Sequence, residues 1–396
     1  MSLSIITTLV CIVHLFVGYS ESLTVSKRSS NISETDTNLL KTHYDVIIVG
    51  GGPAGLSALC SLARVRHSVL LIDSGEYRNS PSRRVHDVIG SDGIPPALFR
   101  SKAREQAAKF KTATLQNGTV ISIIRDKETP SFITTLSSGK RYTSRKIVLA
   151  TGLRDILPNV TGIEEVWGRG MYWCVWCDGW GHRDQTLGII ASLPRVISGI
   201  VQILKLNKDV IAFVNGTDTP ENRRLLEEDV PGWEKYMKLN GVEIENRTIS
   251  AFERLQDGDV HRDEIQSTDN DKFRIILEDG SQITRDSFLA SFPKVQHSYL
   301  GANIGVHLVG DRIYVDPSNM KAAPGVWGIG DANSDNSTNV PHALYSGKKA
   351  AVSIHFELGN ESLIQSLNES SIMKRSESDQ LREMENGLED IWNSVK

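Results

Sequence analysis

The chain has few cysteines and almost no net charge. Its 396 residues include four cysteines, and its 44 basic residues nearly balance 48 acidic ones. This balance provides no electrostatic basis for binding nucleic acid or a membrane surface, so we expect neither as a partner. Only Cys11 and Cys60 lie outside the central cysteine pair, and no histidine pair has zinc-finger spacing. A tetrahedral zinc site would lack ligands, and no metal is expected.

The N-terminal apolar stretch is too short for a membrane span, which needs about 20 residues. It covers residues 5–17 and is interrupted by Thr7, Thr8 and His14. With the small residues that end the segment 1–20 it has the shape of a signal peptide, although no Lys or Arg precedes it. A signal anchor is the alternative. We expect cleavage, which leaves no membrane span.

The following segment, residues 21–42, is polar and is predicted to be an unfolded propeptide. Its Lys27-Arg28 pair offers a cleavage site to a furin- or kexin-like protease. Glycosylation acceptors of the Asn-x-Ser/Thr type exceed the number expected by chance. They begin at Asn31, Asn117, Asn159, Asn215, Asn246, Asn336, Asn360 and Asn368. We therefore expect a secreted protein, or one in the lumen of the secretory pathway.

The central cysteine pair, Cys174 and Cys177, lies in the run Trp173–Gly179. Cysteines two residues apart can close a disulfide across one helical turn, and a helix N-terminus lowers the pKa of the leading thiol. The pair is therefore predicted to exchange electrons. A zinc ligand pair and an inert structural disulfide are the alternatives. The remaining mature cysteine, Cys60, lies in an apolar stretch and is expected to be a core thiol.

A dinucleotide-binding motif lies near the start of the mature chain. The buried-strand run 44–49 is followed by the glycine motif Gly50–Gly55, a helical stretch to about Arg64, and a second strand, 68–72, that ends in Asp73. In such a unit the glycines let a pyrophosphate approach the backbone, the helix N-terminus stabilises its charge, and the acid takes the ribose hydroxyls. This order and spacing predict an α/β fold that binds a dinucleotide.

Two further motifs favour FAD as the dinucleotide. A strand at 147–149 ends in Ala150-Thr151-Gly152, and a strand at 326–329 ends in Gly330-Asp331. Flavoprotein disulfide reductases carry such turns in this order after the glycine motif.

From about His43 to Leu358 the chain resembles the low-molecular-weight thioredoxin reductase flavoproteins, because these motifs and Cys-x-x-Cys-Asp-Gly occur in that family's order. Longer stretches resemble the fungal dithiol oxidase branch, of which gliotoxin dithiol oxidase is the type. They are Ser74–Asn79, His86 with Gly90–Pro96, and Asp331–Ala343.

The resemblance implies two Rossmann-like domains and a homodimer. The FAD-binding domain would comprise residues 43–160 and 291–360, the inserted NAD(P)-like domain with the cysteine pair residues 161–290, and a polar tail residues 361–396. The implied FAD contacts are Gly50, Gly52, Pro53, Ala54, Gly55, Asp73, Ser74, Glu76, Arg78, His86, Val120, Ala150, Thr151, Gly152, Asp331, His342 and Ala343.

The inserted domain lacks the residues that would hold NADPH. After the strand 186–190 the turn Ala191–Val196 contains no glycine, and Pro194 removes an N–H donor. The next turn has Asn215-Gly216-Thr217 where a pair of arginines would grip a 2′-phosphate. Arg223 and Arg224 lie in a polar helical stretch, where a solvated face is expected. A flavin without this donor would be reduced by a dithiol substrate and reoxidised by oxygen.

By family analogy Cys174 is the exposed sulfur that exchanges with substrate, and Cys177 lies against the flavin. The proton acceptor is expected to be Asp178 or His342. Asp178 could instead cap a helix, and His342 could merely pack against FAD. Tyr172, Trp173, Trp176 and Trp180 crowd the motif, either as a substrate pocket or as core.

The sequence thus predicts an FAD-dependent dithiol oxidase that forms a disulfide in a small secondary metabolite or peptide. An NADPH-dependent thioredoxin reductase with a divergent loop and a redox-inert flavin-binding scaffold are the alternatives.

Overall fold

The computed structural model describes residues 42–394, and beyond residue 370 it describes side chains only at Ser378 and Arg382. The predicted signal peptide, the dibasic site, the Asn31 acceptor and all but the last residue of the 21–42 segment lie outside the described residues.

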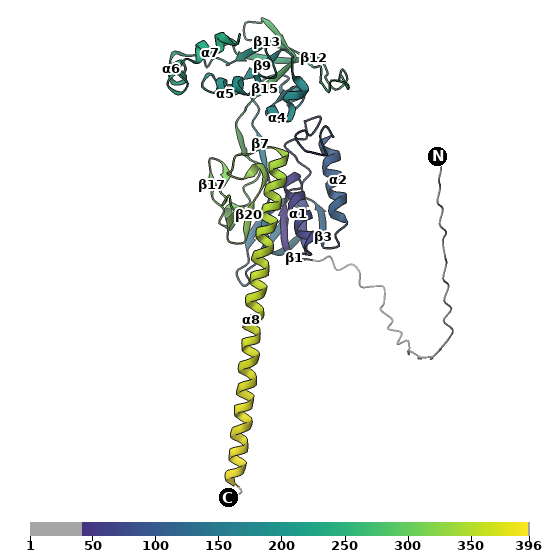
Figure 1. The fold of residues 1–396 in the computed structure, drawn as a ribbon, viewed down its shortest axis with the longest axis vertical. Helices are drawn as coiled ribbons and strands as arrows, with labels where there is room; N and C mark the ends of the chain where they lie inside the picture. Colours follow the sequence, from purple (N-terminus) through teal and green to yellow (C-terminus); the bar gives the residue numbers. More distant parts are fainter. Residues whose placement is uncertain (1–41, 395–396) are drawn as a thin grey trace, which may run out of the picture. The chain divides into compact units, whose positions relative to one another are not determined.

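The first α/β unit is built on an eight-stranded sheet (Figure 1). Its main path runs β19-β20-β6-β1-β2-β3, with β5 pairing with β6 and β4 with β5. β20, β6, β1, β2 and β3 are parallel neighbours. The strands are β1 His43–Val49, β2 Val69–Asp73, β3 Ala113–Asn117, β4 Val120–Arg125, β5 Phe132–Leu136, β6 Arg141–Leu149, β19 Lys321–Ala323 and β20 Val326–Gly328. The uninterrupted apolar runs of β1 and β2 are typical of parallel strands that are buried on both faces.

Three helices accompany this sheet. α1, Pro53–Arg64, connects β1 to β2 and begins with Pro53, whose fixed φ and missing N–H suit the first helical turn. α2 spans Pro96–Ala108, and α8 spans Val340–Ser394. Figure 1 shows α8 running along α1 and continuing past the sheet.

The second α/β unit is inserted between β6 and β20. Its five-stranded parallel sheet has the order β11-β10-β9-β15-β8, with β8 Met171–Tyr172, β9 Leu187–Ile190, β10 Val210–Phe213, β11 Glu243–Glu245 and β15 Ser287–Ala290. An antiparallel sheet of β12 Ile249–Gln256, β13 Lys272–Leu277 and β14 Gln282–Arg285 adjoins it in sequence. The helices are α3 Ile163–Val166, α4 Val175–Asp178, η1 Gly179–His182, α5 Leu193–Ile203, α6 Pro220–Asp229 and α7 Trp233–Leu239.

Two chain segments join the units, and they pair with each other. β7, Leu153–Asp155, leads into the insertion, and β16, Lys294–Gln296, leads out of it as its antiparallel partner. The return segment contains η2 Ala302–Ile304, β17 Leu308–Val309, β18 Arg312–Ile313 and η3 Gly330–Ala332. The predicted fold class, two Rossmann-like units with the second inserted into the first, is confirmed.

The segment from residue 361, expected from the sequence only as a polar tail, is helical. It continues α8 without a break to Ser394. The segment contains no proline and one glycine, and its commonest good helix formers are Glu and Leu, which lose little side-chain freedom in a helix. No helix within the described residues is both long and apolar enough to cross a membrane.

α8 approaches α1 closely because it carries a glycine at the contact. A Cβ at Gly347 would come closer than 3.0 Å to the carbonyl oxygen of Ala54, whereas a Cβ at Gly359 on the same helix would meet nothing within 4 Å. The contact is reinforced by Ser57 Oγ, which donates to Leu344 O at 2.7 Å. Farther along, buried Lys146 pairs with Glu357 at 2.7 Å.

We predict that Gly347→Ala lowers the stability of the folded protein by about 1 to 3 kcal/mol, because the added methyl group overpacks the contact between α1 and α8. Gly359→Ala is the matched control and should be neutral or stabilising by up to ~1 kcal/mol, since alanine favours helix. Thermal unfolding of both variants is the measurement. Equal melting temperatures would contradict the packing described here.

Candidate active site

A cavity of about 350 Å³ lies at the carboxyl ends of β1, β2 and β6. Its walls come from the glycine turn, the segment after β2, the turn after β6, η3 and the start of α8, and from the cysteine motif of the inserted unit. Open α/β sheets bind their ligands at this edge, because the turns there present backbone groups and helix N-termini to one crevice.

The glycines of the first turn have separate structural roles. Gly50 has φ +111°, and a Cβ there would come closer than 3.0 Å to Ala150 O. A Cβ at Gly55 would collide with the carbonyl oxygen of Gly50. A Cβ at Gly52 would meet no protein atom within 4 Å. Gly50 and Gly55 therefore permit close packing, and Gly52 leaves the space at the N-terminus of α1 open.

Most predicted cofactor contacts line the cavity. They are Gly50, Gly52, Pro53, Ala54, Asp73, Ser74, Glu76, Arg78, His86, Val120, Ala150, Thr151, Gly152, Asp331 and Ala343. Gly55 and His342 do not line the cavity, and their contact with the cofactor stays a prediction. Gly55 packs under the turn rather than facing the cavity. His342 is in the first turn of α8, and its Nε2 lies 3.0 Å from the carboxylate of Asp335.

Asp73, at the end of β2, is buried and its carboxylate is already engaged within the protein. It accepts from Tyr77 Oη at 2.5 Å, from Gly75 N at 3.0 Å and from Arg104. Its side chain still lines the cavity. The loop after β2 is thereby tied to the strand end, which fixes the cavity wall.

Arg78, which lines the cavity, joins two carboxylates. It binds Asp155 through Nε at 2.7 Å and Nη2 at 2.9 Å, and Asp331 through Nη1 at 2.8 Å. Its guanidinium carbon also lies 5.1 Å from the ring centroid of Trp173. Asp155 was not identified from the sequence, because no motif marks it. Arg78 holds the strand linking the two units next to the Gly-Asp turn.

One buried hydroxyl at the cavity has no protein partner among the described residues. Thr151 Oγ1, in the Ala-Thr-Gly turn, is buried without a hydrogen bond. Buried polar groups nearly always have a partner, so the turn fits a ligand that supplies one. With the open space at Gly52, the residues present fit a dinucleotide.

Cys174 and Cys177 form a disulfide with their Cα atoms 5.2 Å apart. Cys174 is the N-cap of α4, and its sulfur accepts a hydrogen bond from Cys177 N at 3.2 Å. Cys177 lines the cavity, and Cys174 does not. One sulfur of the bond thus faces the dinucleotide cavity, and the other lies outside it.

The aromatic residues of the motif divide between core and surface. Tyr172 is buried and stacks on His182, and Trp173 stacks on Trp167 with ring centroids 4.9 Å apart. Trp176 is 70% exposed and Trp180 is 62% exposed. Tyr172 is therefore core, Trp173 is partly buried and lines the cavity, and Trp176 and Trp180 expose their rings to solvent.

Asp178 lines the cavity beside Cys177 and has an unusual pKa. Burial raises the pKa of Asp178 to about 7, helped by the charge of Asp269 and opposed by that of Arg83. The alternative that Asp178 caps a helix is wrong, because its side chain makes no capping hydrogen bond to η1. A carboxyl group with a pKa near neutrality can both accept and release a proton at physiological pH. Between the two predicted proton acceptors, only Asp178 lies in the cavity.

The turn of the second unit that would hold a second nucleotide is filled by the protein itself. Leu193, at the start of α5, is fully buried, and its N–H donates to Thr217 Oγ1 at 2.9 Å. Arg223 is paired with Asp218 and Glu234, and Arg224 with Glu228. Both side chains are solvent-exposed and paired on the helix surface, in agreement with the expected solvated face.

Arg83 and Arg84, which no motif marks, connect the loop after β2 to the inserted unit. Arg84 lines the cavity and lies 3.2 Å from Asp269, and Arg83 Nη1 lies 2.8 Å from Asp271. Within the part of the chain whose side chains are described, no group of three or more His, Cys, Asp or Glu residues is arranged to hold a metal.

Comparison with known proteins places the chain in a family. Residues 44–186 match the family model described as pyridine nucleotide-disulphide oxidoreductase. A probable thioredoxin reductase of Arthroderma benhamiae is 42% identical over 88% of this chain and 90% of its own length. The thioredoxin reductase tcpT of Claviceps purpurea is 29% identical over 77% of this chain and 91% of its own length.

Among solved structures, that of HlmI is 26% identical, with a TM-score of 0.71, and covers 83% of this chain and 96% of its own. A thioredoxin reductase of Bacillus anthracis shares the fold at a TM-score of 0.70 and 20% identity, over 81% of this chain and 99% of its own. Together with the glycine turn and the cysteine pair on one cavity, these matches show that the chain belongs to the pyridine nucleotide-disulphide oxidoreductases, in their thioredoxin reductase-like branch.

Proposed function

We propose that the protein is an FAD-dependent dithiol oxidase that converts a small dithiol to a disulfide and reduces oxygen. The observation that carries the proposal is the placement of the Cys174–Cys177 disulfide, with Cys177 lining the dinucleotide cavity and Cys174 outside it. A bond in this position connects a substrate on one side to a cofactor on the other.

Exchange begins at Cys174. A substrate thiolate attacks its sulfur, the bond to Cys177 breaks, and Cys177 leaves as a thiolate. The second substrate thiolate then attacks the substrate sulfur of this mixed disulfide and releases Cys174. The hydrogen bond from Cys177 N stabilises the departing Cys174 thiolate. Trp176 and Trp180, in and directly after the Cys-x-x-Cys segment, expose their rings, which favours a compact apolar dithiol.

Asp178 is the group we assign to proton transfer. The reaction R(SH)2 + O2 → RS2 + H2O2 removes two protons and two electrons from the substrate and delivers them to oxygen. The carboxylate of Asp178, next to Cys177 and with a pKa of about 7, can take a substrate proton and return it toward the cavity.

FAD, held in the cavity by the glycine turn, Thr151 and the Gly330-Asp331 turn, would accept two electrons from the reduced cysteine pair and pass them to oxygen. The open space at Gly52 and the unpartnered Thr151 hydroxyl support its binding. Arg78 and Asp73 hold the surrounding walls in place.

Oxygen is proposed as the acceptor because the second unit is poorly built for NADPH. The buried Leu193, the N–H already taken by Thr217 and the absence of a glycine in residues 191–196 leave its phosphates few backbone donors. An NADPH-dependent thioredoxin reductase is the second candidate, favoured by the name of the 42% identical relative. We also propose that the protein is secreted, on the grounds of its acceptor sequences and N-terminal segment.

We predict that the purified protein contains non-covalent FAD and that Gly52→Val loses it. A Cβ at Gly52 meets no protein atom within 4 Å, so the valine side chain would enter the open space at the N-terminus of α1 where the pyrophosphate is expected. The variant should therefore fold but lack flavin absorbance, whereas Gly359→Ala should retain it. A colourless wild-type protein that takes up no FAD would refute the assignment of the cavity.

We predict that dithiothreitol reduces the flavin anaerobically and supports oxygen consumption, and that NADPH does neither. An anaerobic spectrum followed by an oxygen-electrode trace tests both. Rapid bleaching by NADPH but not by the dithiol would replace the oxidase with the reductase.

The cysteine variants should fail at different steps. Cys177→Ser should bind FAD, and its free Cys174 thiolate should attack a disulfide probe, the oxidised dimer of a small monothiol, to form a mixed disulfide and release the other half of the probe as a thiol, but its flavin should stay oxidised when a dithiol is added. Cys174→Ser should also bind FAD but should not be labelled by the probe. Both should lose at least ~1000-fold in turnover, since the exchange needs both sulfurs. Mass spectrometry of the trapped protein distinguishes them, and labelling of Cys174→Ser alone would reverse the assigned roles.

A further inference from the structure

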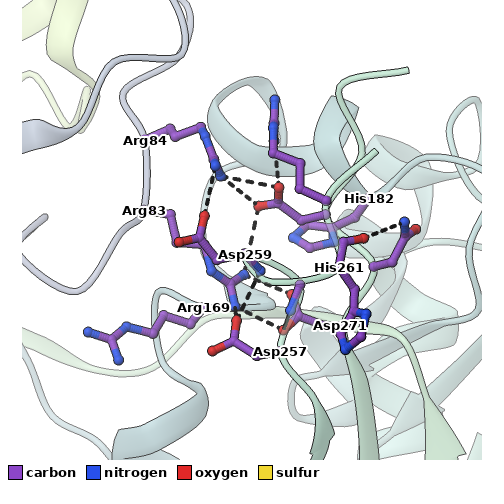
Figure 2. A network of polar contacts seen from close by, with 12 residues as sticks. Arg83, Arg84, Arg169, His182, Asp257, Asp259, His261 and Asp271 are labelled. Atoms are coloured by element: carbon purple, nitrogen blue, oxygen red, sulfur yellow. Dashed lines mark hydrogen bonds and ion pairs between the residues drawn. The ribbon is translucent and has the colours of Figure 1, made fainter. Parts of the chain in front are cut away.

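A dense group of ion pairs lies outside the residues assigned above to exchange and proton transfer. Figure 2 shows it between the loop after β2 and the connection from β12 to β13. We call it the Arg83 cluster. Its members are Arg83, Arg84, Arg254, Arg262, Asp257, Asp259, Asp269 and Asp271. Four cations and four anions balance.

The cluster crosses from one unit to the other. Arg83 reaches Asp271 at 2.8 Å and Asp257 at 2.6 Å, and Arg84 reaches Asp259 at 2.7 Å. Both arginines belong to the first unit, and the aspartates lie at the ends of β12 and β13 or between them. Asp271 is fully buried, with Arg254 as its second cation at 2.5 Å. Breaking a buried pair leaves an uncompensated charge, so these contacts hold the two units together at the cavity.

The cluster also contacts the segment that follows Asp178. Asp269 donates its N–H to Gly181 O at 2.9 Å, and its own carbonyl accepts from Gln185 Nε2 at 2.8 Å. Gly181 is in η1, which begins directly after Asp178. The turn that carries the Asp269 carboxylate is therefore fixed relative to the cavity.

The charges of two cluster members act on Asp178 in opposite directions. Asp269 favours its neutral form by like-charge repulsion, and Arg83 favours its carboxylate. Tyr172, buried on the same motif, also faces Asp178. The other titratable or charged groups that line the same cavity are Asp73, Glu76, Tyr77, Arg78, Arg84, His86, His297 and Asp331. His182, in the η1 helix that follows Asp178, is buried and is itself acted on by Asp269, Asp271 and Arg83.

We propose that Arg83 and Asp269 are positioning residues that set the protonation state of Asp178 and thereby the pH range in which the cysteine pair exchanges with substrate. The inference rests on the proposed function, in which Asp178 transfers the proton. Arg83 and Asp269 touch neither substrate nor cofactor in this account. They act through Asp178, from a cluster that the fold holds rigid.

The test is the pH dependence of oxygen consumption with dithiothreitol for Arg83→Gln and Asp269→Asn. The rate should fall below the pKa of Asp178. Loss of the Asp269 charge should move this acid limb to lower pH, and loss of the Arg83 charge should move it to higher pH, each by roughly half to one pH unit. The dithiol ionises identically in every assay. The ratio of each variant's rate of oxygen consumption to that of the wild type therefore reports only the titration of the protein group.

Two further variants separate charge from structure. Arg83→Lys keeps the positive charge. It should return the acid limb of the pH profile to its wild-type position even if the two hydrogen bonds from Arg83 to Asp271 are lost. Arg274 and Glu253 form an exposed pair at 2.8 Å on the same β12–β13 hairpin, outside the cluster. Arg274→Gln and Glu253→Gln are the matched controls. Neither should shift the acid limb of the pH profile of oxygen consumption.

A second readout does not depend on turnover. The pKa of Asp178 in the folded protein lies above its ordinary value of 3.8, so ionisation of this group costs stability as the pH rises from about 4 to about 7. The gain in melting temperature of Asp178→Asn over wild type should therefore grow across this window and level off above it. When Asp178→Asn is added to Asp269→Asn, this gain in melting temperature should level off at a lower pH than in the wild type. When Asp178→Asn is added to Arg83→Gln, the gain should level off at a higher pH.

Shifts in the same direction, or none, in both readouts would overturn the inference. If the wild type oxidises no dithiol, the proposed function fails, and the melting series alone decides whether Arg83 and Asp269 control Asp178.

Discussion

The cavity depends on one close approach of backbone to backbone. The turn after β1 packs against the turn after β6 so tightly that a Cβ at Gly50 would collide with Ala150 O, and a Cβ at Gly55 would collide with Gly50 O. Only glycine fits at both positions. This packing brings the carboxyl ends of β1 and β6 together and leaves the space at Gly52 open. The walls of the cavity, from Arg78 to the Gly330-Asp331 turn, are arranged around that edge.

The second unit contributes to the same cavity through a very short segment. α4 has four residues, and its N-cap cysteine lies outside the cavity while the cysteine three residues later lines it. Such a short helix can position a sulfur only if the unit that carries it is itself held. β7 and β16 provide the covalent link, and the Arg83 cluster provides a second contact between the units. The ion pairs of the Arg83 cluster therefore help to fix where Cys174 and Cys177 lie relative to the cavity.

The two units share a fold and differ in what their first turns offer a ligand. In the first unit the turn is glycine-rich and open, and a buried hydroxyl nearby lacks a partner. In the second unit the corresponding helix begins with a buried leucine whose N–H is already used by Thr217. A fold does not by itself imply a ligand, because the donors and the space at the turn decide binding. This contrast is the ground for the proposal that the protein uses one dinucleotide rather than two.

The sequence alone determined the α/β fold class, the family, the first glycine turn and the cysteine pair, because the motifs that indicate them consist of residues a few positions apart. Most of the implied cofactor contacts also lie at the cavity for this reason. Only the tertiary structure decided that Asp178 rather than His342 faces the cavity, and that Trp176 and Trp180 are surface while Tyr172 is core. It also revealed the Arg83 cluster, in which Arg83 and Asp271 are 188 residues apart. Burial and long-range charge pairing arise from packing between distant segments, and no local pattern in the chain encodes them.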